Sequence, residues 1–176
     1  MKLIKRINYY FDRISHDIRL INIKSILIIS SITLFSGLFS WIIGGRADRV
    51  VLLYIFPRGA LPLGIMYFLW AISFAYIGII IGGVAYGCEK YKKREAIKSV
   101  AFLILAFMCL LCVYPLFFKS LSPLITFIVL LVSVFFTFLA LISCFRIYSL
   151  WTICIFLHLI WLLYNTYMSI IIALIN

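Results

Sequence analysis

Acidic side chains are scarce in this chain of 176 residues, and none of them falls within a long apolar stretch. The five that occur are Asp12, Asp17, Asp48, Glu89 and Glu95. Carriers of ions and protons usually keep an acid or a base inside the bilayer, because a charge at that depth is costly and is retained only where it functions. The apolar stretches also contain no lysine, which a retinal photoreceptor needs for its Schiff base. The sequence therefore disfavours both coupled transport and light sensing.

Catalytic and metal-binding combinations are missing as well. The one histidine within the apolar stretches is His158, and no Asp or Glu can reach it at the same depth, which argues against classical hydrolysis. The five cysteines have neither the even number nor the spacing of a disulfide framework. Cys109 and Cys112 form a CxxC pair without a second pair or a nearby histidine. We interpret them as small apolar residues on one helix face rather than as a metal site.

Long apolar stretches dominate the rest of the chain. Hydrophobic residues make up 66% of it and charged residues 12%, which is far from the composition of a soluble domain. About 20 helical residues cover the hydrocarbon core of a bilayer, and five stretches come near that length or exceed it: 25–44, 61–87, 100–118, 124–145 and 147–175. A β-barrel would alternate apolar and polar residues, whereas these stretches are apolar on every side. The sequence predicts an all-α integral membrane bundle of five transmembrane helices, formed as a single domain by residues 25–176.

The first 24 residues form a basic amphipathic segment. Apolar residues recur in it at helical spacing with basic residues between them, which suits a helix that lies in the headgroup layer. A frayed extension of the first span is the alternative. The net charge of +11 arises from basic residues beside apolar spans, where anionic lipid headgroups are the nearer partner. We therefore expect this charge to meet membrane lipids and not nucleic acid.

Basic residues also indicate an orientation. Six precede the first span, five lie between the second and third spans, and Arg146 lies between the fourth and fifth. The opposite side has Arg46, Arg49, Arg58 and Lys119. The positive-inside rule then places the N-terminus in the cytoplasm and Asn176 outside. We expect the protein to be integral to the cytoplasmic membrane.

Aromatic side chains are the main chemistry that the spans offer. Phe, Tyr and Trp form 18% of the chain, and those within or at the ends of spans include Trp70, Phe74, Tyr114, Phe117, Phe118, Trp161 and Tyr164. Such side chains can build a pocket for a flat apolar ligand between helices. They can equally serve as interfacial anchors or as packing within a bundle, so composition leaves both interpretations open.

The spacing of the rarer residues around the second span is more specific. The string FPRGALPLGIMYFLWAISFAYIG carries Pro57, Pro62, Trp70, Phe74 and Gly78. Their order resembles the second span of the translocator protein family, which includes the tryptophan-rich sensory proteins (TspO).

Two further segments are similar to the same family. VYPLFFKSLSP, which contains Pro115 and Phe118, resembles W-S-P-L-F-F at the end of the family's third span. In the last span Trp161, Tyr164 and Asn176 are in register with the family pattern. The resemblance extends from residue 35 to residue 176 and includes five spans with a first loop near 15 residues.

The chain also departs from the family pattern at positions expected in a pocket. Gly64 and Val113 stand where the family has tryptophans, and Leu110 replaces an asparagine. In the last span Asn165 replaces a small residue and Ser169 an asparagine. Any pocket in this chain must therefore be rebuilt from different side chains.

The resemblance implies a receptor or carrier, often dimeric, that binds porphyrin or haem and in some members a sterol. We therefore expect a homodimer that has no obligatory cofactor and binds a planar hydrophobic ligand between its helices. On this basis the ligand-binding residues are Trp70, Phe74, Pro115, Phe118, His158, Trp161 and Asn165. A porphyrin would stack on the aromatic side chains, and its propionates would need cations in the loop over the pocket, for which the candidates are Arg46, Arg49 and Arg58.

Three alternatives stay open. His158 could be an axial ligand of haem iron or hydrogen-bond to another helix. The resemblance also allows an enzyme that breaks down porphyrin, although the sequence itself points to no catalytic residue. A bundle that only packs against another membrane protein is the third, because Ser36 with Ser40 and Gly78 with Gly82 form small-xxx-small pairs.

Overall fold

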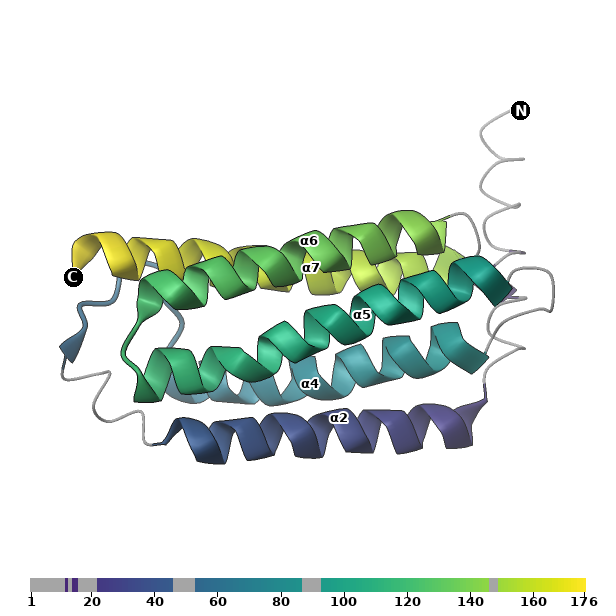
Figure 1. Cartoon of the computed structure of the whole chain (residues 1–176), viewed down its shortest axis with the longest axis horizontal. Helices are drawn as coiled ribbons and strands as arrows, with labels where there is room; N and C mark the ends of the chain where they lie inside the picture. Colours follow the sequence, from purple (N-terminus) through teal and green to yellow (C-terminus); the bar gives the residue numbers. More distant parts are fainter. Residues whose placement is uncertain (1–11, 13, 16–21, 46–52, 87–92, 146–148) are drawn as a thin grey trace.

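The chain folds into long helices that run side by side (Figure 1). The structure, a computed structural model, describes residues 12, 14, 15, 22–45, 53–86, 93–145 and 149–176. Within these ranges there is no strand, and the elements are α2 (Ile23–Gly44), α4 (Leu63–Tyr86), α5 (Lys93–Tyr114), the π-helix η2 (Pro115–Lys119), α6 (Pro123–Phe145) and α7 (Ser149–Ile175). Five of these described helices, with η2 extending α5, are long and apolar enough to cross a membrane. The predicted all-α membrane bundle of five helices is confirmed.

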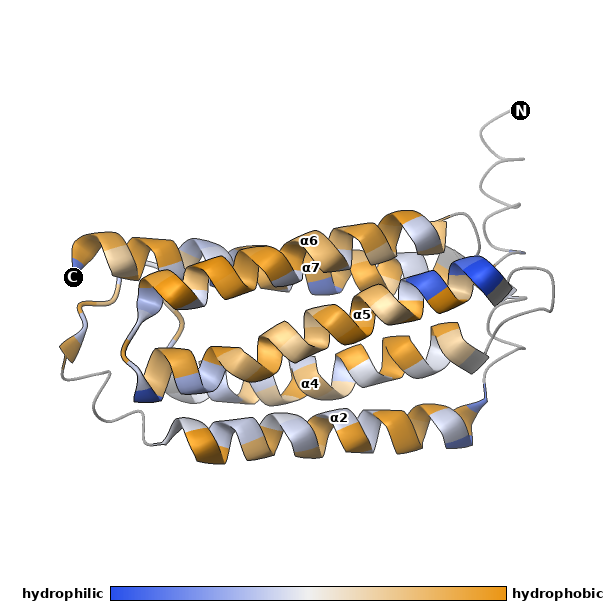
Figure 2. Cartoon of the chain, in the orientation of Figure 1, coloured by the Kyte–Doolittle hydropathy of each residue, from blue (hydrophilic) through white to orange (hydrophobic). Residues whose placement is uncertain are grey.

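The helix bounds agree with the predicted spans except at the start of α5. That helix begins at Lys93 instead of near residue 100, and its first turns include a hydrogen bond of 2.7 Å from Lys98 Nζ to Glu95 Oε1. Figure 2 shows this end of α5 in blue, while the ribbon is otherwise mostly orange. Apolar residues mark only the hydrophobic part of the helix, so a charged extension gives no such signal. The predicted amphipathic segment of residues 1–24 lies almost entirely outside the described residues.

The helices form a closed ring in the order α2, α4, α7, α6 and α5, with α5 returning to α2. Within the ring α4 is the most enclosed helix, because it also packs against α5, and Ile77, Ile80 and Val84 on it are fully buried. Asn176, the end of η2 and the start of α4 lie at one end of the bundle, on the left in Figure 1. This end is called the Asn176 end below.

Each neighbouring pair of helices in this ring is joined by a hydroxyl that donates to a backbone carbonyl. A carbonyl has two lone pairs, so it can accept such a bond and keep its bond within the helix. The donors and acceptors are Ser30 and Ala75 (3.0 Å, α2 to α4), Tyr76 and Cys154 (3.1 Å, α4 to α7), Ser169 and Pro123 (2.9 Å, α7 to α6), Ser133 and Ala106 (3.1 Å, α6 to α5), Ser99 and Ala140 (3.1 Å, α5 to α6), and Ser40 and Leu111 (α2 to α5). Polar side chains thus connect the helices of the ring. In lipid, the hydrophobic effect gives helices little driving force to associate.

Pro115 explains one of these bonds. In a continuous α-helix the N–H of residue 115 would donate to the carbonyl of Leu111, but proline has no N–H. The hydroxyl of Ser40 donates to that carbonyl from α2. Beyond the proline the chain widens into the π-turn of η2, in which Ser120 N donates to Pro115 O over 3.0 Å. The proline therefore both docks α2 on α5 and changes the course of the chain.

Glycines allow α2 and α4 to approach closely. A Cβ on Gly78 of α4 would lie 2.6 Å from Ser30 Cα and 3.0 Å from Ile29 O of α2, and it would overlap the hydroxyl of Thr33. A Cβ on Gly37 of α2 would overlap the ring of Phe74. Backbones this close permit the bond from Ser30 to α4, as small residues do in membrane bundles generally.

Replacing Gly78 by alanine should destabilise the bundle. The added methyl meets backbone atoms of α2, which have no alternative rotamer to adopt. Overpacking of this kind costs about 1–3 kcal/mol. The matched control is Gly64→Ala in the same helix, where a Cβ meets nothing within 4 Å. In thermal unfolding in detergent, Gly78→Ala should lower the midpoint and Gly64→Ala should not. Equal midpoints for the two variants would contradict the close packing of α2 on α4.

Candidate functional site

A partly open cavity of about 70 Å³ lies at the Asn176 end of the bundle. It is enclosed by the start of α4, the end of α5, η2, the start of α6, the last turns of α7 and the segment before α4. Its walls are largely apolar, and the lining residues are Phe56, Ala60, Leu61, Met66, Tyr67, Trp70, Val113, Tyr114, Phe117, Phe118, Thr126, Leu130, Tyr164, Asn165, Met168, Ser169 and Ile172. Ligand pockets for drug-sized molecules occupy about 300–1,000 Å³. In this conformation the cavity therefore has room for a small group only.

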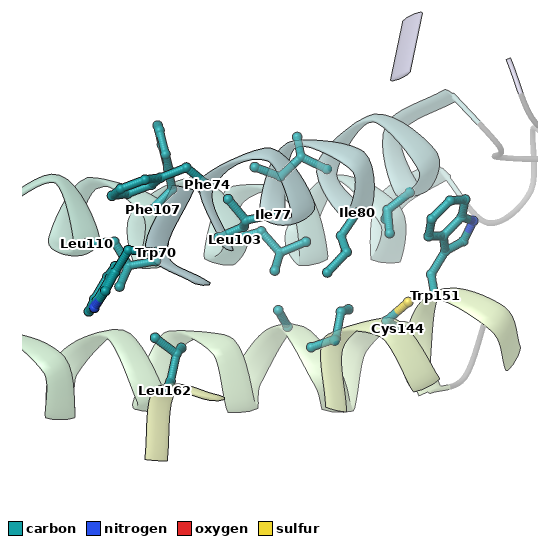
Figure 3. Close-up of a cluster of buried hydrophobic side chains, with 14 of the residues drawn as sticks. Trp70, Phe74, Ile77, Ile80, Leu103, Phe107, Leu110, Cys144, Trp151 and Leu162 are labelled. Carbon is teal, nitrogen blue, oxygen red and sulfur yellow. The ribbon is translucent and has the colours of Figure 1, made fainter. Parts of the chain in front are cut away.

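Trp70 forms the inner wall of the cavity. Its side chain is 6% exposed, and its ring centroid lies 5.6 Å from Tyr114, 5.9 Å from Phe74 and 6.1 Å from Trp161. The two indoles meet edge to face, with their planes at 69°, a favourable arrangement of aromatic quadrupoles. Figure 3 shows Trp70 at one end of the buried cluster, pointing from α4 into the space between the helices. The indole is thus directed into the bundle and away from lipid.

The π-turn of η2 builds a second wall. Phe118 stacks on Tyr114 at 5.2 Å and lies 5.9 Å from Tyr67, while Phe117 lies 5.1 Å from Phe118. Both phenylalanines line the cavity. A π-turn holds an additional residue in its turn and is frequent at functional sites. Because the wide turn starts at Pro115, this proline positions the aromatic wall without lining the cavity itself.

Three small polar side chains line the cavity where α6 meets α7. Thr126, Asn165 and Ser169 line the cavity there and are at most 4% exposed. Thr126 Oγ1 donates to Ser122 O over 2.9 Å, and Ser169 Oγ donates to Pro123 O over 2.9 Å. We call this group of three residues the polar corner; the tyrosine hydroxyls of the lining belong to Tyr67, Tyr114 and Tyr164.

Residues 53–62 form a cover segment that crosses the end of the bundle before α4. The Tyr54 hydroxyl donates to Leu121 O over 2.6 Å. The Asn176 amide pairs twice with the backbone of Ile55: Oδ1 accepts from Ile55 N at 2.7 Å, and Nδ2 donates to Ile55 O at 3.1 Å. The cover segment is thereby fixed to the connection before α6 and to the residue after α7.

Tyr164 holds the other part of the cover segment. Its hydroxyl accepts a hydrogen bond from Leu61 N at 3.3 Å and donates to Gly59 O at 3.4 Å. Gly59 has a φ of 98°, a backbone conformation that glycine adopts without steric cost. Since Leu61 also lines the cavity, Tyr164 places part of the roof directly.

The structure brings some of the predicted ligand-binding residues together and separates others. Trp70, Phe118 and Asn165 line the cavity. Trp161 contacts Trp70 edge to face and stacks on Tyr164 at 5.6 Å, but it does not line the cavity. Their roles in binding stay predictions.

Phe74, His158 and the arginines lie elsewhere. Phe74 lines a second, smaller pocket with Gly37 and Trp41, between α2 and α4. His158 is 2% exposed, lies 6.2 Å from the ring of Tyr76, and its Nε2 has no hydrogen-bond partner among the described residues. Within the same described part of the chain, no group of three His, Cys, Asp or Glu residues could hold a metal ion. Both alternatives for this histidine stay predictions.

The predicted cations are described in part. Arg58 is exposed in the cover segment, whereas Arg46 and Arg49 lie outside the described residues. Lys119 is also exposed, directly after the aromatic wall of η2. Two cations thus lie within two residues of lining side chains.

Several lining residues were not predicted from the sequence. Tyr67 lies three positions before Trp70 on α4, and helical spacing could have placed it on the same face. Thr126 and Met168 had no such signal, because only the packing of α6 against α7 brings them to the cavity. The tethering role of Asn176 depends likewise on a long-range contact.

No protein-family model matches this chain, and no curated protein matches it significantly. The resemblance to the translocator protein family thus rests on the sequence positions alone and remains a prediction.

Removing the Tyr164 hydroxyl should loosen the cover segment. Tyr164→Phe keeps the ring and its stacking on Trp161 but deletes the hydrogen bonds to Leu61 and Gly59. We expect faster backbone hydrogen exchange in residues 59–61, by about threefold or more for a lost bond of roughly 1 kcal/mol, and unchanged exchange in α6. Tyr167→Phe is the control, because that side chain is 57% exposed on the outer face of α7. Equal exchange in both variants would show that Tyr164 does not hold the cover.

Proposed function

We propose that this protein is an integral membrane receptor or carrier of the translocator protein type, which binds a planar hydrophobic ligand in the aromatic cavity. The observation that carries the proposal is the position of Trp70, buried in the bundle against Trp161 and exposed on one side to a cavity. Flat π-systems stack on such side chains with about 0.5–1.5 kcal/mol beyond the gain from burial.

The size of the cavity bears on the ligand. In the described conformation it accommodates a small group or the edge of a ring, since its volume is about 70 Å³. A whole porphyrin or a sterol enters only when the roof moves. That roof is tied by side-chain hydrogen bonds of Tyr54, Tyr164 and Asn176, and individual bonds of this kind contribute about 0.5–1.5 kcal/mol each. A cover held this way can open without unfolding the helices.

The charges at the Asn176 end favour a ligand with an acidic group. Arg58 and Lys119 are exposed at the end of the bundle where the cavity lies. A porphyrin carries carboxylates at its edge, so its apolar face could lie among the aromatic rings while a carboxylate meets one of these cations. The arrangement thus suits a planar amphiphile.

A role as a pure interaction subunit receives less support. Both small-xxx-small pairs are engaged within the chain: a Cβ on Gly78 or Gly82 would meet backbone atoms of α2, and Ser40 donates to Leu111 O of α5. Ser36 donates to Ile32 O within its own helix. Gly78, Gly82 and Ser40 thus pack the bundle internally and do not require a foreign partner.

Protoporphyrin binding tests the proposal. Protein in nanodiscs of uncharged lipid should show a saturable change in porphyrin absorbance beyond that of empty nanodiscs. Trp70→Phe should weaken the affinity about threefold to tenfold, because it removes part of the stacking surface. Trp151→Phe is the matched control: Trp151 is also buried, at 4% exposure, but lies at the far end of the cluster (Figure 3).

The outcomes separate the parts of the proposal. Saturable binding that weakens only in Trp70→Phe supports it. Equal weakening in both variants would mean that stability and not contact is responsible. Binding of small aromatic rings without any binding of porphyrin would exclude porphyrin as the ligand and would leave the cavity as a binding site.

Reporter fusions expressed in a bacterium test the orientation, which we propose to be N-terminus in the cytoplasm. Alkaline phosphatase, which needs disulfides and an oxidising compartment, should be active when fused after Asn176. The same enzyme fused after Lys92, in the basic connection between α4 and α5, should be inactive because twelve basic residues share that side. Reversed activities would invert the orientation.

A further inference from the structure

Hydrogen-bond accounting at the polar corner shows which ligand groups it can serve. A hydroxyl has one hydrogen and two lone pairs. The hydrogens of Thr126 and Ser169 are already directed to the carbonyls of Ser122 and Pro123. What these two hydroxyls can offer to a ligand is therefore lone pairs, so both act as acceptors.

Asn165 adds a third acceptor. Its Nδ2 donates to Trp161 O over 2.7 Å, and because a carbonyl only accepts, the atom beside it must be the amide nitrogen. Oδ1 therefore points away from that carbonyl, and no residue in the described part of the chain donates to it. The side chain is 4% exposed and lines the cavity. One amide hydrogen of Asn165 also remains, so the corner holds three acceptor oxygens for one free donor.

The three residues converge because of helical spacing and one bond between helices. Asn165 and Ser169 are four residues apart on one face of α7. Ser169 bonds to the first residue of α6, and Thr126 follows Pro123 by three positions on that helix. All three thus border the same part of the cavity.

We propose that the polar corner selects ligands that carry an N–H or O–H donor on an otherwise apolar ring system. This inference rests on the proposed binding function and adds the chemical class of the ligand. A ring that places a donor against Thr126, Asn165 and Ser169 gains a hydrogen bond in a water-poor site. A ring that places only an acceptor there meets mostly lone pairs, with the remaining amide hydrogen of Asn165 as the one donor of the corner. Such a ring offsets less of its lost hydration.

Two isosteric probes test the selection. 5-Fluoroindole has a ring N–H, and 5-fluorobenzofuran has an oxygen at the same position, with nearly equal shape. Both are far smaller than a porphyrin, so they need less movement of the roof to enter the cavity. Their dissociation constants are measured by ¹⁹F NMR titration of the protein in nanodiscs, after subtraction of partition into empty nanodiscs. We expect 5-fluoroindole to bind about threefold to tenfold more tightly, as for one net hydrogen bond.

Variants in the polar corner should abolish the preference for 5-fluoroindole and leave binding in the cavity intact. Ser169→Ala and Asn165→Leu each remove an acceptor, and each should bring the affinity ratio close to one. The affinity for 5-fluorobenzofuran should change by less than about twofold, since this probe makes no such bond. Two variants are used because, if one of them fails to fold, the other still tests the preference.

Matched controls come from the same kinds of hydrogen bond outside the cavity. Ser133→Ala is matched to Ser169→Ala, because Ser133 is fully buried and also donates to a carbonyl of a neighbouring helix. Thr137→Val is matched to Thr126→Val, because both threonines donate to the carbonyl four residues earlier. The preference for the indole should survive in both controls and be lost in Thr126→Val.

The results distinguish this inference from the binding function. Equal affinities for the two probes in the unsubstituted protein would overturn donor selection and leave the cavity as a binding site. Tighter binding of the benzofuran would overturn it as well. Absence of saturable binding of either probe would overturn the binding function together with the inference.

Discussion

The rest of the structure depends on hydroxyl groups that donate to carbonyls of neighbouring helices. In a bilayer, lipid chains are as apolar as leucine side chains, so burial alone does not decide which helix faces which. Here every neighbouring pair in the ring has at least one such bond, from Ser30 in α2 to Ser169 in α7. A polar hydroxyl in hydrocarbon is costly without a partner, and in each of these bonds the partner lies on a neighbouring helix. The order of the ring follows from these pairings.

Pro115 connects this packing to the candidate site. Its missing N–H frees the carbonyl of Leu111 for Ser40, which brings α2 against α5. The same residue starts the π-turn that directs Phe117 and Phe118 to the cavity. A single loss of a hydrogen-bond donor therefore shapes both a helix contact and an aromatic wall. Van der Waals packing at Gly78 and Gly37 completes the arrangement on the side of α2.

The sequence predicted those site residues that belong to an aromatic motif within a single segment. Trp70 and Phe118 were expected from their motifs, and both line the cavity. Phe74 follows Trp70 by one helical turn and yet faces a different pocket, toward α2, because Gly37 leaves room for its ring. Whether a side chain on an apolar helix faces lipid, a neighbour or a cavity depends on the other helices. Such helices have no polar face that would reveal it.

The sequence by itself determined that this is a bundle of five membrane-spanning helices, because backbone groups in hydrocarbon must bond within a helix and about 20 apolar residues suffice to span it. It also determined that the five apolar stretches contain no acid, lysine or arginine. The tertiary structure alone decided the order of the helices, the cover tied down by Asn176, and the meeting of Thr126 with Asn165 and Ser169. These features come from side chains far apart in the chain, and the hydrogen bonds that join them depend on distances that no local pattern encodes.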